Sequence, residues 1–382
     1  MLQLKSKLPN TPTSIFSVMS SLAGAHNAIN LSQGFPNFDP PLELRELVFE
    51  HMQSGHNQYA PMPGLPALRT VLAQKHFLQS GKKIDPNTDI TITAGATQAL
   101  YTAITAIVQK GDEVILLEPA YDSYRPSVEL SGGKVIAYNL QHADYSINWQ
   151  DFAQLITDKT RLIILNTPHN PTGTIWNRSD WEQLEKVVDG TNIFILSDEV
   201  YEQLVYDNKK HLGLLDFPKL YERGMATFSF GKTFHSTGWK MGYCLGPEYL
   251  MNEFRKIHQF NVFSVNSPVQ YALATFLENP TNYQYLADFY QQKRDFFLTT
   301  MKGSSLKPLA CSGTYFQLFD YSHIKPNMKD TDFANWLTTE IGVAAIPVSA
   351  FCTNPGNEKV IRLCFAKTED VLEQAAERLL QL

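Results

Sequence analysis

The sequence has little charge and little cysteine for its length. Only 18% of its 382 residues are charged, and 32 basic residues against 38 acidic ones give a formal net charge of -6. Proteins that bind nucleic acid or an anionic membrane surface normally present a basic patch, so this balance argues against both partners. The sequence also lacks any run of eighteen apolar residues, and we therefore expect no membrane-spanning helix.

The four cysteines, Cys244, Cys311, Cys352 and Cys364, have none of the paired spacings typical of zinc sites. We expect no metal centre, and such sparse cysteine suits a reducing compartment, which favours the cytoplasm. Two nucleotide-binding fingerprints are missing as well, because neither GxGxxG nor GxxxxGK[ST] occurs. An NAD-dependent enzyme and a nucleoside-triphosphate-binding protein therefore lose their main sequence support.

Short β-branched runs alternate with helical stretches from residue 89 onward. The runs are DITITA, EVILLEP, KVIAY, RLIILNTP, IFILSDE and ATFSFG. This alternation predicts an α/β fold with a largely parallel sheet covered by helices on both faces, so that function lies at the carboxyl ends of the strands. After about residue 282, a long polar helical stretch and shorter strands predict a smaller α+β domain. We expect a large domain at residues 37–281 and a small domain made of residues 1–36 with 282–382.

Unusual residues gather where the predicted strands end. Gly95, Ala96 and Thr97 lead from a strand straight into a helix, whose free N–H groups can bind phosphate, although small residues there also serve packing alone. Asn170 lies in NTPHNPTG, whose prolines and glycine predict an ordered turn that asparagine side chains can cap. Asp198 ends an apolar strand, where a carboxylate needs a cationic or hydrogen-bonding partner unless it only caps the next helix.

The stretch SFGKTFHSTGWKMG, residues 229–242, carries Lys232 and Lys240 together with three glycines and no acidic residue. An exposed helical face would mix charges of both signs and avoid glycine. We therefore expect irregular backbone that holds two cations toward an anionic ligand. A lysine in such a place can have a lowered pKa and act as a nucleophilic amine toward a carbonyl group.

Six residues of this stretch resemble the S-x-G-K-x(5)-G-x-[RK]-x-G signature of class I pyridoxal-phosphate aminotransferases of fold type I: Ser229, Gly231, Lys232, Gly238, Lys240 and Gly242. NTPHNPTG, SDEVY and RLCFAK match other landmarks of that family in the same order. LSQGFPNFDPP, NQYAPMPGLPALR and EPAYDSY resemble its kynurenine aminotransferase branch, and FSVNSPVQ resembles the bacterial members that act on methionine. The resemblance implies a mostly parallel seven-stranded sheet with helices on both faces and a smaller α+β domain.

The resemblance also implies pyridoxal 5'-phosphate as the cofactor and assigns roles around its ring. Lys232 would bind the cofactor covalently and move the proton between the substrate Cα and the cofactor C4′. Asp198 would pair with the pyridine nitrogen. Tyr201 and Asn170 would donate hydrogen bonds to the phenolic oxygen, and Tyr121 would stack on the ring.

Further donors are implied for the phosphate and the substrate. The phosphate would be held by Gly95, Ala96, Thr97, Ser229 and Lys240, with Tyr59 reaching in from the neighbouring subunit of a homodimer with shared active sites. Arg362 would bind the substrate α-carboxylate, helped by Asn170 and the backbone of Gly34. The substrate side chain would face an apolar pocket without an evident second arginine, formed by Phe35, Tyr59 and Phe263.

The predicted enzyme is a transaminase that passes the amino group of methionine or a large neutral or aromatic amino acid to a 2-oxo acid by a ping-pong Schiff-base mechanism. The nearest alternative is a kynurenine or glutamine aminotransferase with cysteine S-conjugate β-lyase activity, which needs the same residues. A regulatory domain of the same fold is a third reading. It would require a DNA-binding module, and the basic residues for one are missing.

Overall fold

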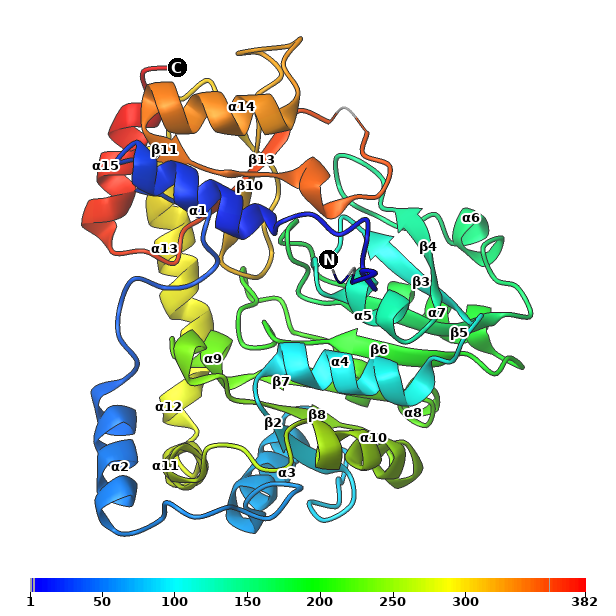
Figure 1. The fold of residues 1–382 in the computed structure, drawn as a ribbon. Helices are drawn as coiled ribbons and strands as arrows, with labels where there is room; N and C mark the ends of the chain where they lie inside the picture. Colours follow the sequence, from blue (N-terminus) through cyan, green and yellow to red (C-terminus); the bar gives the residue numbers. More distant parts are fainter. Residues whose placement is uncertain (1, 3, 357) are drawn as a thin grey trace.

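The computed structural model describes residues 2, 4–356 and 358–382 of the chain, and a seven-stranded sheet lies at its centre (Figure 1). In spatial order the strands are β2 (Ile90–Thr93), β8 (Gly242–Leu245), β7 (Gly224–Ser229), β6 (Phe194–Asp198), β5 (Thr160–Asn166), β3 (Glu113–Glu118) and β4 (Lys134–Asn139). Strand β8 is antiparallel to both of its neighbours, and the remaining pairs are parallel. The predicted α/β class with a mostly parallel sheet is confirmed.

Alternate side chains of the strands pack against helices on opposite faces of this sheet. In β5, Leu162 and Ile164 belong to one core cluster, whereas Ile163 and Leu165 belong to another. A strand buried on both faces needs apolar residues at consecutive positions, which explains the uninterrupted run RLIIL. The helices of the first face are α4 (Ala96–Ile107), α5 (Tyr124–Leu130) and α10 (Glu248–Asn261), and those of the second are α3 (Pro66–Ser80) and α7 (Arg178–Val188).

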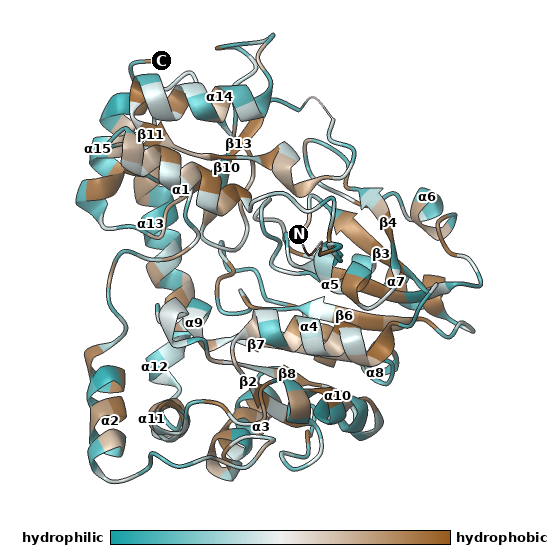
Figure 2. Ribbon diagram, in the orientation of Figure 1, coloured by the Kyte–Doolittle hydropathy of each residue, from teal (hydrophilic) through white to brown (hydrophobic). Residues whose placement is uncertain are grey.

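The remaining helices of this region lie around the edges of the sheet. At the β2 edge, α2 (Leu42–Gln53) and α11 (Ser267–Leu277) pack against each other, and α11 also packs on α3. Figure 2 shows hydrophobic residues concentrated in the strands and on inward helix surfaces. The shorter helices are α6 (Trp149–Ala153), α8 (Pro218–Tyr221), α9 (Phe230–Thr233) and α12 (Thr281–Gln284), with single helical turns η1 (Leu214–Asp216) and η2 (Thr237–Trp239).

A second, smaller sheet has the strand order β12 (Ile346–Pro347), β13 (Val360–Cys364), β10 (Phe316–Asp320) and β9 (Lys307–Pro308). Near the chain start, β1 (Ile29–Asn30) pairs in parallel with β11 (Val343–Ala344), so the N-terminal segment joins the C-terminal part. This pairing supports the division into residues 37–281 and 1–36 with 282–382, which we keep as a proposal. The helices of this part are α1 (Ile15–Ala25), α13 (Leu286–Thr300), α14 (Asp330–Trp336), α15 (Glu369–Leu379), η3 (Leu337–Ile341) and η4 (Val348–Phe351).

Three local features differ from the sequence prediction. The antiparallel strand β8 was not expected, because its four residues begin with a glycine and carry no alternation. The stretch 229–242 is not wholly irregular, since α9 and η2 form one helical turn each around Lys232 and before Lys240. The apolar run VAAIPV contributes to two different sheets through β11 and β12. In each case a tertiary neighbour decides the conformation of a segment too short to specify it.

Among the described residues, no helix is both long and apolar enough to cross a membrane. The described part of the chain also contains no group of three or more His, Cys, Asp or Glu side chains arranged to hold a metal ion.

Gly242 couples the sheet to the start of α4, and its replacement tests that coupling. A Cβ at this position would stand 2.5 Å from the Phe228 carbonyl oxygen and 2.9 Å from the Ala96 nitrogen. Because both neighbours are backbone atoms, we expect Gly242→Ala to lower the free energy of unfolding by about 1–3 kcal/mol. Urea denaturation measures this change.

Gly238→Ala is the matched control in the same segment, since a Cβ there meets nothing within 4 Å. We expect the control to change stability by less than about 0.5 kcal/mol. Equal effects of the two substitutions would contradict the packing argument.

Candidate active site

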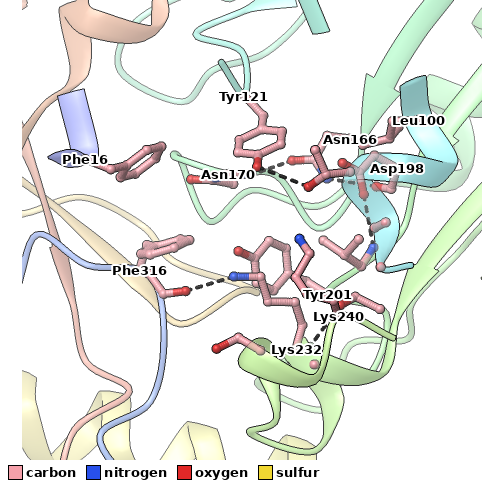
Figure 3. A pocket seen from close by; sticks show the side chains of 18 of the residues that line it. Phe16, Leu100, Tyr121, Asn166, Asn170, Asp198, Tyr201, Lys232, Lys240 and Phe316 are labelled. Atoms are coloured by element: carbon pink, nitrogen blue, oxygen red, sulfur yellow. Dashed lines mark hydrogen bonds between the residues drawn. The ribbon is translucent and has the colours of Figure 1, made fainter. Parts of the chain in front are cut away.

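A cavity of about 310 Å³ lies at the carboxyl ends of β5, β6 and β7, where it meets residues of β13 and the N-terminal segment. Figure 3 shows Lys232 and Lys240 on one side of this cavity, with Asp198, Asn170 and Tyr121 across from them. The carboxyl ends of parallel strands meet at one edge, which is why side chains so distant in sequence converge here. The cavity contains twelve of the expected site residues: Gly34, Gly95, Ala96, Thr97, Tyr121, Asn170, Asp198, Tyr201, Ser229, Lys232, Lys240 and Arg362.

The start of α4 has the properties of an anion site. Gly95 precedes the helix with φ 79° and ψ 170°, so no side chain caps the first N–H groups, and no acidic residue lies in the first turn. The Lys240 Nζ lies 3.6 Å from the point where a Cβ on Gly95 would stand. Lys240 itself adopts a left-handed backbone conformation, with φ 53° and ψ 50°, that brings its amine to this helix start. Free N–H groups, the positive end of a helix dipole and an ammonium group together suit a phosphate.

Asp198 is a buried carboxylate without an ion-pair partner in the described part of the chain. Its side chain is 4% exposed, accepts a hydrogen bond of 2.6 Å from the Tyr124 hydroxyl and one of 3.3 Å from the Val200 N–H. Burial raises the pKa of this carboxyl from 3.8 to about 6. An isolated buried charge is costly, so Asp198 is suited to a cationic ligand group such as a protonated ring nitrogen.

Lys232 leaves α9 with its amine in the cavity. The Nζ donates hydrogen bonds of 2.8 Å to the Gly34 carbonyl oxygen and 2.8 Å to the Tyr315 hydroxyl. Burial lowers the pKa of the amine to about 8, and the positive charges of Arg362 and Lys240 act in the same direction. An amine with this pKa is partly neutral near physiological pH and therefore nucleophilic.

Arg362 is fully buried between the two sheets. Its Nη1 donates a hydrogen bond of 2.6 Å to the Asn170 Oδ1, and its Nη2 donates one of 3.0 Å to the Ser32 carbonyl. The guanidinium carbon lies 3.8 Å from the centre of the Phe316 ring. Burial lowers the pKa of Arg362 to about 10, and its Nε has no hydrogen-bond partner among the described residues. A buried guanidinium with free donor capacity is suited to a carboxylate.

Two tyrosines, Tyr201 and Tyr121, also line the cavity. Tyr201 is 2% exposed, and its ring meets that of Tyr315 edge-on at 5.2 Å. Burial raises the pKa of Tyr201 well above its ordinary value, so the phenol stays a neutral hydrogen-bond donor. Tyr121 lines the cavity, and its ring packs edge-on against Tyr124 with centroids 5.6 Å apart.

Three expected residues do not line the cavity that this chain forms: Phe35, Tyr59 and Phe263. Tyr59 is 81% exposed, and its ring contacts the Phe263 ring at a centroid distance of 5.4 Å. Phe35 is also exposed, and its backbone carbonyl accepts a hydrogen bond from the Lys367 amine. That Tyr59 reaches the active site of a second subunit, and that Phe35 and Phe263 face the substrate side chain, stay predictions.

Sequence reasoning missed several residues that the fold brings to the site. Phe16 and Gln33 line the cavity from the N-terminal segment, and Phe316 lines it from β10. Tyr124 and Tyr315 hydrogen-bond to Asp198 and Lys232. Four of the five are aromatic residues inside apolar or helical patterns, where the pattern alone indicates a core position. Only Tyr124 had a signal, because it is the last residue of the motif EPAYDSY.

The donor set fits pyridoxal phosphate. The uncapped start of α4 with Lys240 suits the phosphate, the unpaired Asp198 carboxylate suits the ring nitrogen, and the Lys232 amine suits the aldehyde carbon. These three groups line a single cavity. A parallel α/β fold with such a site defines the class of enzymes that carry out amine chemistry on this cofactor.

Comparison with known proteins identifies the family. The family model for aminotransferase class I and II matches residues 26–379, and the chain belongs to this family. It is 52% identical to the methionine aminotransferase of Escherichia coli K12 over 99% of this chain and 98% of that protein. It is 36% identical to the kynurenine–oxoglutarate transaminase of Dictyostelium discoideum, over 97% of this chain and 94% of the relative.

The fold agrees with solved aminotransferase structures. The crystal structure of YbdL from Escherichia coli, for which a methionine aminotransferase function has been identified, superimposes with a TM-score of 0.98. That comparison covers 100% of both chains at 52% identity. The chain is thus a transaminase of the fold type I architecture, and this family implies pyridoxal phosphate as the cofactor.

The raised pKa of Asp198 predicts a pH-dependent stability of the cofactor-free protein. The folded pKa of about 6 exceeds the ordinary 3.8, so the carboxyl favours folding when protonated and loses that contribution as pH rises through 6. Asp198→Asn cannot ionise. Between about pH 4 and pH 8, we expect the variant to gain up to about 3 kcal/mol of unfolding free energy relative to the parent protein.

Urea denaturation of cofactor-free protein at both pH values measures this difference. Asp158→Asn, at an exposed position, is the control and is expected to show no such gain. A difference between variant and parent that is the same at both pH values would contradict a raised Asp198 pKa.

Proposed function

We propose that this chain is a pyridoxal-phosphate-dependent transaminase that takes the amino group from methionine and other large neutral or aromatic amino acids and passes it to a 2-oxo acid. The observation that carries the proposal is the convergence of Lys232, Asp198 and Arg362 on one cavity. Family membership supports the reaction class. The full-length similarity to a methionine aminotransferase supports the donor.

The cavity wall supports a neutral substrate side chain. Arg362 is the only arginine among the described residues that line it, and an acidic side chain would need a second cation. Apolar surface comes from Phe16, Leu100 and Phe316. A thioether or an aromatic ring is therefore better accommodated than a second carboxylate.

Cofactor binding would rest on four sets of contacts from this chain. The first turn of α4 with Ser229 and Lys240 would hold the phosphate, and Asp198 would hold the ring nitrogen in its protonated form. Tyr121 would pack against the ring, while Tyr201 and Asn170 would donate hydrogen bonds to its phenolic oxygen. When bound, the cofactor supplies a ring that withdraws electrons from the substrate Cα.

Arg362 and Lys232 would act on the substrate directly. The Arg362 guanidinium would bind the α-carboxylate, with Asn170 holding the guanidinium and Gly34 contributing its backbone. The Lys232 amine, once free, would take the proton from Cα and return it to the carbon on the other side of the amino nitrogen. Its lowered pKa, about 8, favours the neutral form that accepts a proton. Donor and acceptor would occupy the site in turn, which gives ping-pong kinetics.

We also propose a homodimer with shared active sites. Large apolar side chains are exposed together on and beside α2, at the end of α10 and in the loop that carries Tyr59: Leu42, Phe49, Met52, Tyr59, Phe260 and Phe263. Such exposure in a protein of this size favours an interface.

We propose the cytoplasm as the location of the protein, because its four cysteines are free thiols, which suit a reducing compartment.

The two lysines of the 229–242 segment are expected to have different functions. Lys232→Ala should reduce transamination by at least about 1,000-fold, because the covalent anchor and the proton carrier are lost together. Lys240→Ala should weaken cofactor binding by about 10- to 100-fold, because a charged hydrogen bond to phosphate is lost. Measured turnover and cofactor titration distinguish the two effects.

Lys83→Ala removes an exposed lysine away from the cavity and serves as the control. If Lys232→Ala retained full turnover, the proposed mechanism would be wrong. If Lys240→Ala bound the cofactor as tightly as the control, the phosphate assignment would be wrong.

A panel of amino donors tests the proposed specificity. We expect kcat/KM for methionine and phenylalanine to exceed that for aspartate by at least about 100-fold, because a second buried carboxylate would lie without a partner. The assay measures 2-oxo acid formation with several acceptors. A preference for aspartate would contradict the proposal.

The alternative function is a cysteine S-conjugate β-lyase of the kynurenine aminotransferase type. Because the chain is similar to a kynurenine transaminase, a cysteine S-conjugate belongs in the same panel of substrates. Both activities begin with loss of the Cα proton and differ in the bond that breaks next. Release of pyruvate and ammonia from a cysteine S-conjugate, faster than transamination of methionine, would favour the alternative.

A further inference from the structure

The Lys232 amine, the Tyr315 hydroxyl and the Gly34 carbonyl form a closed triangle of hydrogen bonds. The Lys232 Nζ lies 2.8 Å from the Gly34 oxygen and 2.8 Å from the Tyr315 oxygen. The Tyr315 hydroxyl lies 2.7 Å from the same Gly34 oxygen. Tyr315 belongs to none of the roles assigned above.

We propose that Tyr315 is a positioning residue for the Lys232 amine: whenever that amine is free, the Tyr315 oxygen and the Gly34 carbonyl together hold it in one orientation, with its remaining valence turned toward the cavity. This inference rests on the proposed transaminase function. Tyr315 would act through Lys232 and would touch neither the substrate nor the cofactor.

The number of hydrogen atoms on the amine and the hydroxyl decides which group donates and which accepts in each hydrogen bond of the triangle. A phenol has one hydrogen, and Tyr315 donates it to the Gly34 carbonyl. Its oxygen is then an acceptor for Lys232. A neutral amine has two hydrogens, and the two acceptors use both of them. The lone pair that accepts a proton therefore points away from Tyr315 and Gly34, which leaves the cavity as its direction.

Packing holds the Tyr315 ring in a single place. The ring is fully buried and contacts the rings of Tyr201 at 5.2 Å, Phe316 at 4.9 Å and Tyr290 at 5.7 Å. Tyr290 is tied in turn to the segment that carries Lys232, since its hydroxyl lies 2.9 Å from the His235 Nδ1. An acceptor that is held this rigidly restricts the flexible lysine side chain to a few rotamers. Without it, the amine would sample other orientations and be less often in place for proton transfer.

The Gly34 carbonyl is held equally firmly. A Cβ on Gly34 would stand 2.8 Å from the Phe316 ring, so the backbone lies directly against a buried aromatic side chain. The charged or titratable groups that face Lys232 come from every element around it: Cys364, Arg362, Asp198, Lys240, Tyr201 and Tyr315. Of these, Tyr315 is the one that Lys232 contacts by a hydrogen bond.

Tyr315→Phe removes the acceptor and keeps the ring. In the loaded enzyme we expect kcat for methionine to fall about 10-fold with KM within about 2-fold, because orientation is lost and binding is not. Tyr321→Phe is the matched control. It deletes the hydroxyl of another fully buried ring, one that donates to the Met328 carbonyl and not to a residue around Lys232, and we expect kcat within about 2-fold of the parent.

A second readout is independent of turnover. In the full-length cofactor-free protein, the acetylation of Lys232 by acetic anhydride is followed against pH by mass spectrometry of the peptide that carries it. We expect the apparent pKa of Lys232 to fall by about 0.5–1 pH unit in Tyr315→Phe, because an ammonium group loses more than a neutral amine when an acceptor is removed. Tyr321→Phe should leave this pKa unchanged.

The proposal is overturned if Tyr315→Phe matches Tyr321→Phe in both kcat and the Lys232 pKa, which would assign Tyr315 to packing alone. Should Tyr315→Phe fail to fold, 3-fluorotyrosine at position 315 keeps the hydroxyl and weakens it as an acceptor. A lowered Lys232 pKa in that protein supports the proposal, and an unchanged one overturns it. Since acetylation requires neither cofactor nor amino acid, its result is separate from whether the chain transaminates methionine.

Discussion

The hydrogen bond from Arg362 to the Asn170 side chain, 2.6 Å long, joins positions 192 residues apart and connects the two sheets at the cavity. Both residues are buried, so neither group can exchange its partner for water without cost. A third segment joins through the Ser32 carbonyl, which accepts from the same guanidinium. The position of the substrate carboxylate relative to Lys232 depends on this contact, because Lys232 is fixed to the adjacent Gly34 carbonyl.

Burial shifts the pKa values of two groups that line the same cavity. It lowers the pKa of Lys232 to about 8 and raises that of Asp198 to about 6, so each group is shifted toward its neutral form. A ligand with a phosphate, a ring nitrogen and an aldehyde would supply the partners that these groups lack within the chain. Burying these groups costs free energy. The apolar strands beside them, which are covered by helices on both faces, supply the folding free energy that offsets this cost.

Several parts of the structure could be predicted from the sequence. The α/β class follows from apolar runs such as RLIIL, and the anion site follows from the small residues at Gly95. Other parts could not be predicted, because the segments concerned are too short to specify a conformation. The strand β8 has four residues and exists because β2 and β7 pair with it on either side. Tyr315 has the sequence pattern of a core aromatic, and only its contact with Lys232 distinguishes it.

The sequence by itself indicated the reaction class, because the motif around Lys232 and Lys240, together with NTPHNPTG, SDEVY and RLCFAK, resembles class I aminotransferases. The residues of a local motif lie close together in the folded chain because they are close in the sequence, so the motif alone indicates the chemistry. The tertiary structure alone decided which distant groups complete the site: Tyr124 beside Asp198, Tyr315 beside Lys232, and Phe16 at the cavity wall. The first pairing depends on how α5 packs on the large sheet, and the other two depend on how the two sheets meet. Contacts between remote segments leave no periodic signal in the sequence.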